Sequence, residues 1–413
     1  MLKKALYTLS IVSISTAALA SGYQISEYST VNLGRSFAGA GVVGDDFSAL
    51  GYNPAGMSIN ETSGVQGGAA GILLHSDYKD LRPVSEGGTD IKRSSKMGRV
   101  LPHIFTQYKA SDKLTLGIGF YTPYGLITDY KNDFFGSEHG LFSGLKVMDL
   151  SAGFSYQIHP MFSVGAAVNG QYIHARLTKT KGGAFVDMEG DDTGVGYMLG
   201  ATFTPQKNIR LGISYRSKVS HELEGDITMG PIGSDIKAKV TTPELMLISG
   251  AYDVNNKLTL SASARWTKWQ RFKNLDVFNT TQLGPYPAGS KISSTHENWK
   301  NTWFYSIGAD YKINENWTVR LGTAYDETVI KSSAYRTVRI PDGHRLFASL
   351  GLSYATGNWQ YDLAYTHVWM RHGNAHGGER INPNNPNSAS QNANIRYSHA
   401  GAYMGGFSIQ YKF

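Results

Sequence analysis

The sequence predicts an all-β protein: an antiparallel transmembrane β-barrel of fourteen strands, with an N-terminal segment folded inside the lumen. Apolar and polar residues alternate along many segments, so each predicted strand has one apolar face. Short polar turns alternate with long polar loops. The chain contains 47 glycines and 12% aromatic residues, which is typical of a barrel with aromatic girdles.

The first twenty residues have the features of a signal peptide. Lys3 and Lys4 precede an apolar run that ends near Ala17, and residues 18–20 supply small side chains at the cleavage positions. We therefore predict export, with residues 1–20 removed. A membrane anchor is the less favoured alternative, because the apolar run is short and interrupted by polar residues.

Composition narrows the function classes further. The chain has no cysteine, which suits an oxidising compartment and excludes thiolate metal sites. Its formal net charge of +7 is spread along the chain and gives little support for nucleic-acid binding. Because no other apolar window is long enough for a membrane helix, a chain like this enters a membrane as a barrel.

Three short patterns have the spacing of ligand-binding sites, and none of them predicts such a site. "GAGVVG", residues 39–44, matches a dinucleotide fingerprint, but no strand precedes it, and glycines for tight turns explain it better. His372 with His376, and Asp191 with Asp192, lie in polar loops beside glycine, where nothing fixes a ligand geometry. We predict no metal and no cofactor. No serine, histidine and acid occur at matched depth on the strands, so we predict no enzyme activity.

Turns and loops give the number of strands. Six short turns alternating with seven long loops predict fourteen strands, with both chain ends in the periplasm of a Gram-negative bacterium. The last strand ends in Tyr411 and Phe413, which are typical of the signal read by the barrel assembly machinery. The predicted turns are Ala110–Lys113, His159–Met161, Pro205–Asn208, Val254–Lys257, Lys312–Asn316 and Ala355–Asn358. The predicted long loops include Asp80–Met97, Lys179–Thr193, Phe272–Asn298 and Arg371–Tyr397.

The segment before the first strand has no place in the barrel wall. A barrel of this size would enclose an open lumen if nothing filled it. We therefore predict that residues 21–62 form a hatch inside the lumen and that residues 63–413 form the barrel, with the first strand starting at about Ser63. Asn53-Pro54-Ala55 reads as a fixed corner just before that strand, since proline restricts the residue before it.

Several segments carry a family resemblance. "SGYQISEYSTVNLGRSFAGAGVVGDDFSALGYNPAGMS" resembles the N-terminal hatch of the FadL family of outer-membrane long-chain fatty acid transporters, which includes related aromatic hydrocarbon transporters. The chain differs from the family at His344 and Phe347, where an acidic residue and Trp are usual. Other similar segments, covering nearly all of the mature chain, are "YTPYGL" (121–126), "YRSKVSHELEGD" (215–226), "HENWKNTW" (296–303), "RIPDGHRLF" (339–347) and the C-terminal "YKF".

The resemblance implies a hatch that gates the barrel and a ligand that leaves sideways into the membrane. Proline cannot donate to a strand ladder and Gly125 permits a kink, so pairing should weaken where this stretch passes. The stretch expected to open this exit is Thr122, Pro123, Tyr124 and Gly125. The matching hatch positions are Gly34, Arg35, Asp45, Asp46, Asn53, Pro54 and Ala55.

Inward-facing charges are the predicted ligand-binding residues. Counting from the nearest short turn, at about 3.3 Å per residue, places Lys300, Asp326 and Arg345 at similar height. Arg216 lies slightly lower, and Arg320 lies much nearer the periplasm. We predict that Lys300 meets a ligand carboxylate, because the family's motif has a lysine there, with Arg345 or Arg216 assisting. In the alternative, Asp326 and Arg345 pair and brace the wall.

These observations predict passive, hatch-gated uptake of long-chain fatty acids or similar hydrophobic compounds across an outer membrane. Aromatic hydrocarbon uptake is the alternative within the family. A general porin and an outer-membrane lipolytic enzyme are alternatives of other classes. The predicted partners are the hydrophobic ligand, outer-membrane lipid with lipopolysaccharide, and the barrel assembly machinery, and the protein is expected to act as a monomer.

Overall fold

The computed structural model describes residues 22–83, 85, 88, 92–130, 133–371, 373–377, 382–385 and 393–413. The predicted signal peptide and His372 lie outside these residues. The strands are β1 (Gly64–Asp80), β2 (Lys92–Lys109), β3 (Leu114–Asp129), β4 (Phe142–His159), β5 (Phe162–Lys181), β6 (Ala184–Gln206), β7 (Ile209–Arg216), β8 (Val219–Met229), β9 (Ile232–Thr242), β10 (Leu245–Asp253), β11 (Leu258–Thr267), β12 (Asn274–Asn279), β13 (Lys291–His296), β14 (Thr302–Lys312), β15 (Trp317–Asp326), β16 (Arg345–Thr356), β17 (Trp359–Met370), β18 (Gly373–Ala375) and β19 (Ile395–Lys412).

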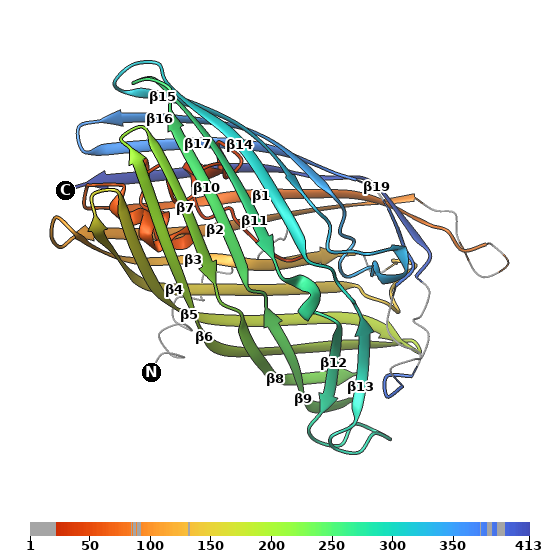
Figure 1. Cartoon of the computed structure of the whole chain (residues 1–413). Coiled ribbons are helices and arrows are strands. Elements are labelled where there is room, and N and C mark those ends of the chain that lie inside the picture. Colours follow the sequence, from red (N-terminus) through yellow and green to blue (C-terminus); the bar gives the residue numbers. More distant parts are fainter. Residues whose placement is uncertain are drawn as a thin grey trace.

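All of these strands belong to one antiparallel sheet that closes on itself, because β1 pairs with both β2 and β19 (Figure 1). Five barrel strands are each divided into two consecutive segments: β7 with β8, β9 with β10, β11 with β12, β13 with β14, and β17 with β18. The described sheet is therefore a closed barrel of fourteen antiparallel strands, which confirms the predicted fold class.

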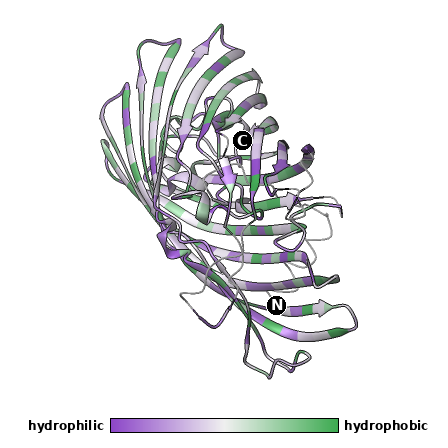
Figure 2. Ribbon diagram, turned by 90° about the vertical axis from the view of Figure 1, so that its right-hand side faces the viewer, coloured by the Kyte–Doolittle hydropathy of each residue, from purple (hydrophilic) through white to green (hydrophobic). Residues whose placement is uncertain are grey.

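The two faces of the barrel wall differ in polarity, as the alternating pattern predicts. On β16, Leu346 and Leu350 are about half exposed on the outer face, whereas Arg345 and Ser349 are buried toward the lumen. Figure 2 shows this alternation as changes of colour along single strands. An apolar outer surface and a polar interior are what a barrel in lipid requires. No helix among the described residues is long and apolar enough to cross a membrane.

The six predicted short turns are all present, and the long loops are shorter than predicted. The predicted loop Lys179–Thr193 is wrong: β5 and β6 continue through it and meet at Gly182-Gly183, where both φ values are positive. Glycine at both central positions favours a two-residue hairpin turn. Glycine and charged residues are frequent in this stretch, so its sequence resembles a polar loop, although Val186 and Met188 are buried. The predicted loops Asp80–Met97, Phe272–Asn298 and Arg371–Tyr397 also contain strand residues of β2, β12, β13, β18 and β19.

Residues 22–62 lie almost entirely buried inside the barrel. They contain two four-residue helices and a 3₁₀ helix, which the sequence did not reveal, and β1 follows them at Gly64, next to the predicted Ser63. The first helix contacts β16 and β17, and the 3₁₀ helix contacts β4, β5 and β6. The helices are α2 (Thr30–Leu33), α3 (Ala49–Tyr52), η1 (Pro54–Ser58), η3 (Trp269–Arg271) and η4 (Ser333–Tyr335).

Candidate ligand-binding site

The extracellular half of the lumen contains an apolar pocket with a cavity volume of about 100 Å³. A concave site lined mainly by hydrophobic side chains with a few polar groups is typical of small-molecule sites. The lining comes from strands far apart in sequence, because inward-facing positions of the long strands converge above the N-terminal segment. Its apolar residues include Leu145, Leu177, Met188, Leu223, Ile236, Val240, Leu275 and Val277.

Two buried charged residues also line the apolar pocket. The Arg339 guanidinium donates to the Phe142 carbonyl oxygen (3.1 Å) and to Ser143 Oγ (2.9 Å). The Glu297 carboxylate accepts from Trp299 Nε1 (3.0 Å). The pocket therefore offers an amphiphile an apolar volume with a cation and an acid at its wall. Our sequence reasoning missed both residues, although they lie within the family-like segments "RIPDGHRLF" and "HENWKNTW".

A second cavity, here called the exit pocket, has a volume of about 70 Å³ and adjoins the first. Leu126 and Ile340 line both cavities. Met97 of β2 and Ile127 of β3 also line the exit pocket. The exit pocket therefore lies beside the part of the wall that is bordered by β2 and β3.

β2 and β3 separate at this level. Their ladder ends at Ile104–Phe120, although both strands continue toward the extracellular side. Against β4, β3 shifts register between Tyr121 and Tyr124 and carries one more residue than its partner, so it bulges at Thr122 and Pro123. The predicted weakening of pairing at this stretch is therefore present, and its role as an exit stays a prediction.

The start of the N-terminal segment contacts this bulge. Ile25 N donates to the Pro123 carbonyl oxygen and Gly125 N donates to the Tyr23 carbonyl oxygen, both at 2.8 Å. Gln24 forms an isolated bridge with Tyr124. The interior segment thus makes the backbone bonds that β2 does not make there.

The predicted head-group residues do not share one site. Arg345 forms ion pairs with Asp326 (3.3 Å) and with Asp342, as the bracing alternative expects. Lys300 is half-buried near the start of β14, and its backbone N–H donates to the Val329 carbonyl oxygen (3.0 Å). Lys300 lines neither of the two cavities, and Arg345 lines the exit pocket.

Arg216 lies deeper, beside the N-terminal segment. Its guanidinium pairs with the buried Asp149 and donates to Tyr121 Oη (3.0 Å). It lines a third cavity, of about 20 Å³, together with Tyr28 and Phe304. Arg216 therefore lies below the apolar pocket.

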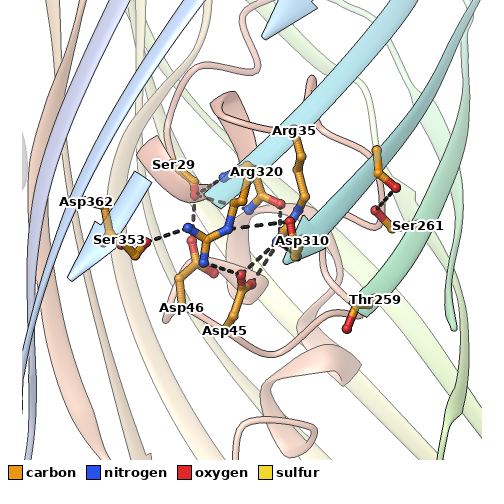
Figure 3. A network of polar contacts seen from close by, with 12 residues as sticks. Ser29, Arg35, Asp45, Asp46, Thr259, Ser261, Asp310, Arg320, Ser353 and Asp362 are labelled. Atoms are coloured by element: carbon orange, nitrogen blue, oxygen red, sulfur yellow. Dashed lines mark hydrogen bonds and ion pairs between the residues drawn. The ribbon is translucent and has the colours of Figure 1, made fainter. Parts of the chain in front are cut away.

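A buried ion-pair network ties the N-terminal segment to the barrel wall (Figure 3). Arg35, whose side chain is 1% exposed, contacts Asp45 at 2.7 Å and Asp310 of β14 at 2.8 Å. Arg320 of β15 contacts the same Asp45 carboxylate at 3.0 Å. Arg320 thus belongs to the anchor of the N-terminal segment, near the periplasmic end. Asp46 instead accepts from Ser29 Oγ (2.5 Å) within the segment.

Close backbone contacts complete this anchor. The Cα atoms of Gly34 and Gly351 pack so tightly that a Cβ on Gly34 would come within 2.7 Å of Gly351 Cα. Any side chain at position 34 would push the segment away from β16.

Asn53, Pro54 and Ala55 form a corner held by the wall. Asn53 Oδ1 accepts from Ala55 N (3.1 Å), and Asn53 Nδ2 donates to the Ala201 carbonyl oxygen of β6 (3.2 Å). Ser155 Oγ of β4 donates to the Ala55 carbonyl oxygen (2.8 Å). Pro54 starts η1, where its missing N–H is not needed.

We predict that deletion of residues 53–55 leaves a barrel that inserts and resists detergent but supports little transport, because the segment loses its bonds to β4 and β6. Heat-modifiable electrophoretic mobility reports the folded barrel, and growth on oleate reports transport. Growth equal to that of the parent would show that this corner is only a connector.

Comparison with known proteins agrees with this architecture. A family model described as "Outer membrane protein transport protein (OMPP1/FadL/TodX)" matches residues 11–413. The chain belongs to this family. Outer membrane protein P1 of Haemophilus influenzae is 25% identical, covering 96% of each chain. The long-chain fatty acid transport protein of Escherichia coli K12 is 24% identical, covering 85% of this chain and 88% of that protein.

Solved structures share the fold. A FadL homologue from Pseudomonas aeruginosa has a TM-score of 0.81 at 22% identity, covering 95% of this chain and all of that one. The toluene transporter TodX of Pseudomonas putida has a TM-score of 0.74 at 18% identity, covering 94% of this chain and 99% of that one. As a member of the OMPP1/FadL/TodX family, the chain is an outer-membrane transporter of hydrophobic compounds. Named members of the family are transporters rather than enzymes.

Proposed function

We propose that this family member takes up long-chain fatty acids. The apolar pocket carries the proposal, because it combines a large hydrophobic lining with a buried arginine. Burial of an acyl chain contributes about 0.8 kcal/mol per methylene, so the pocket would capture the tail. The names of the Escherichia coli and Salmonella relatives support the same substrate class.

In this proposal Arg339 receives the carboxylate. It lines the pocket and is 7% exposed, so an ion pair there would be shielded from water. Glu297 lines the same pocket, and its carboxylate disfavours a ligand carboxylate placed beside it rather than on Arg339. The sequence-based hypothesis places the head group on Lys300 instead, with Arg345 or Arg216 assisting, and the same assay tests it.

Arg339→Gln should weaken oleate binding about tenfold to a hundredfold, because a hydrogen bond to a charged group contributes about 1.5–3 kcal/mol. Equilibrium binding of radiolabelled oleate to the solubilised protein measures this loss. Toluene binding should stay within twofold, since toluene has no charge. Lys300→Ala is the comparison variant. A loss confined to Lys300→Ala would transfer the head-group role to Lys300.

In this proposal the hatch gates the barrel and the exit pocket releases the ligand. Residues 22–62 act as a gate whose arrangement responds to ligand, and their bonds to the β3 bulge link that gate to the exit pocket. Ligand passes from the apolar pocket past Leu126 and Ile340 to the exit pocket, and leaves between β2 and β3 into the membrane. No energy source is needed, because the tail moves between two apolar environments.

Aromatic hydrocarbon uptake is the second candidate, and one observation favours it. A cluster of aromatic rings surrounds Tyr23 of the N-terminal segment, which also lines the apolar pocket. The Tyr23 ring centroid is 4.6 Å from that of Trp269, 5.6 Å from that of Trp299 and 6.0 Å from that of Phe272. Such rings favour edge contacts with a flat aromatic ligand. Toluene binding tighter than that of oleate, unaffected by Arg339→Gln, would select this candidate.

A further inference from the structure

The barrel wall has a second place where neighbouring strands lose their ladder. β10 and β11 pair up to Leu245–Thr267, and Lys268 N donates to the Glu244 carbonyl oxygen (3.0 Å). Beyond this bond the ladder between β9 and β12 resumes only at Ala238–Val277. Residues 239–243 and 269–276 therefore border a stretch without ladder pairs. This stretch is here called the β9–β12 opening.

The apolar pocket lies directly behind the opening. Val240 from one border and Leu275 from the other both line it, as does Phe272. Tyr23 reaches the same border from inside, where its hydroxyl donates to the Thr241 carbonyl oxygen (3.3 Å). No ladder pair between the two described strands closes the wall at this point.

A row of four outward-facing side chains, three of them aromatic, gives the height of the opening relative to the membrane. Tyr215, Met246, Trp266 and Trp303 are consecutive ladder partners across four neighbouring strands, so they share one face. Tyr215 is exposed, which makes this the outer face. Aromatic girdles mark the membrane–water boundary of barrels. The row lies one residue below the last β10–β11 pair, so the opening begins at the level of the outer-leaflet head groups.

The rim of the opening carries positive charge. Lys239, Arg271 and Lys273 are exposed there, and Lys268 is half-buried. Glu244 pairs with Arg271 (2.6 Å) and Lys268 (3.2 Å), which leaves a net positive rim. Glu222, which lies opposite Lys239 on β8, is 3.5 Å from Lys237. A cationic rim at head-group level attracts anionic amphiphiles, with an effect of about 1 kcal/mol per Lys or Arg.

We propose that the β9–β12 opening is a lateral inlet. A single-chain anionic amphiphile dissolved in the outer leaflet inserts its tail between residues 239–243 and 269–276 into the apolar pocket, while the basic rim holds its head group. The inlet rests on the proposed function, since the amphiphile is the transported substrate. Sideways insertion keeps the tail in apolar surroundings, whereas passage through water would cost about 0.8 kcal/mol per exposed methylene.

A matched pair of single-cysteine variants tests the inlet, because the chain has no native cysteine. Thr241→Cys places a thiol on the border, and Ala348→Cys places one at an exposed position of β16, which pairs with neither β9 nor β12. Each is labelled with the same bulky maleimide and reconstituted into vesicles containing lipopolysaccharide. Every variant carries phenylalanine in place of the five other tryptophans, at positions 266, 303, 317, 359 and 369, so that lipid-facing tryptophans do not contribute. Dibromostearate is added to the outer leaflet, and quenching of the remaining tryptophan fluorescence reports its arrival, since Trp269 and Trp299 lie in the cluster beside the pocket.

The label at position 241 should slow quenching at least tenfold, and the label at position 348 should change the rate less than twofold. Both should leave the final extent of quenching unchanged. In unlabelled protein, Lys239→Glu with Lys273→Glu should slow dibromostearate at least fivefold and leave the uncharged dibromostearyl alcohol unchanged. Equal rates for the two labelled variants, with normal final quenching, would overturn the inlet and leave the proposed function standing.

Two further outcomes are decisive. If dibromostearate never quenches unlabelled protein, the pocket does not take the amphiphile, and the proposed function fails together with the inlet. If a dibrominated phospholipid quenches the same tryptophans and excess stearate does not displace it, the opening holds a resident lipid and the inlet is overturned.

Discussion

Deletion of Pro123 is expected to reduce oleate uptake at least tenfold while oleate binding stays within about threefold of the parent. Between Tyr121 and Tyr124, β3 carries one residue more than β4. Without that residue and its proline, β3 has equal spacing with β4 and a full set of backbone donors, so its ladder with β2 can extend beyond Phe120. The exit pocket then loses its outlet, and the apolar pocket keeps its lining.

Accumulation of radiolabelled oleate in cells lacking their own transporter measures uptake, and equilibrium dialysis of the solubilised protein measures binding. Pro123→Ala is the matched control, because it removes the proline and keeps the extra residue. We expect its uptake to stay within twofold of the parent. Parent-level uptake by the deletion variant would rule out release between β2 and β3.

Arg35→Met should detach the N-terminal segment from β14 and β15 and open the lumen. After the change, two buried carboxylates, Asp45 and Asp310, share the single cation Arg320, in a site where Arg35 is 1% exposed. Removal of one member of a buried ion pair typically costs about 3–5 kcal/mol, because the remaining charge stays buried without its partner. A free-energy loss of this size should cause the short, glycine-rich segment to rearrange.

Two measurements check this expectation. Hydrogen exchange of residues 31–47 should accelerate at least a hundredfold, and single-channel recordings should show a larger conductance, while heat-modifiable mobility shows an intact barrel. Arg176→Met is the control, since Arg176 pairs with Asp187 (2.6 Å) at an exposed site, where an ion pair contributes at most about 1 kcal/mol. Unchanged exchange in Arg35→Met would show that other contacts anchor the segment.

The sequence predicted the barrel well, because each of its signals is local. Alternation of polarity needs only neighbouring residues, and each of the six short turns is marked by a few polar residues. The strand ends on the extracellular side were predicted poorly. At Lys179–Thr193, glycine and charged residues interrupt the alternation that identifies a strand in lipid, although Val186 and Met188 of β6 pack in a buried apolar cluster.

The candidate site depended on distances that no local pattern contains. The sequence determined which residues face the lumen and that Pro123 interrupts a strand. Only the tertiary structure decided that Arg320 binds Asp45, that Arg345 binds Asp326, and that Arg339 lies beside an apolar pocket. The physical reason is that alternation fixes the face of a strand, whereas the partner of an inward charge depends on barrel shear and on a segment hundreds of residues away.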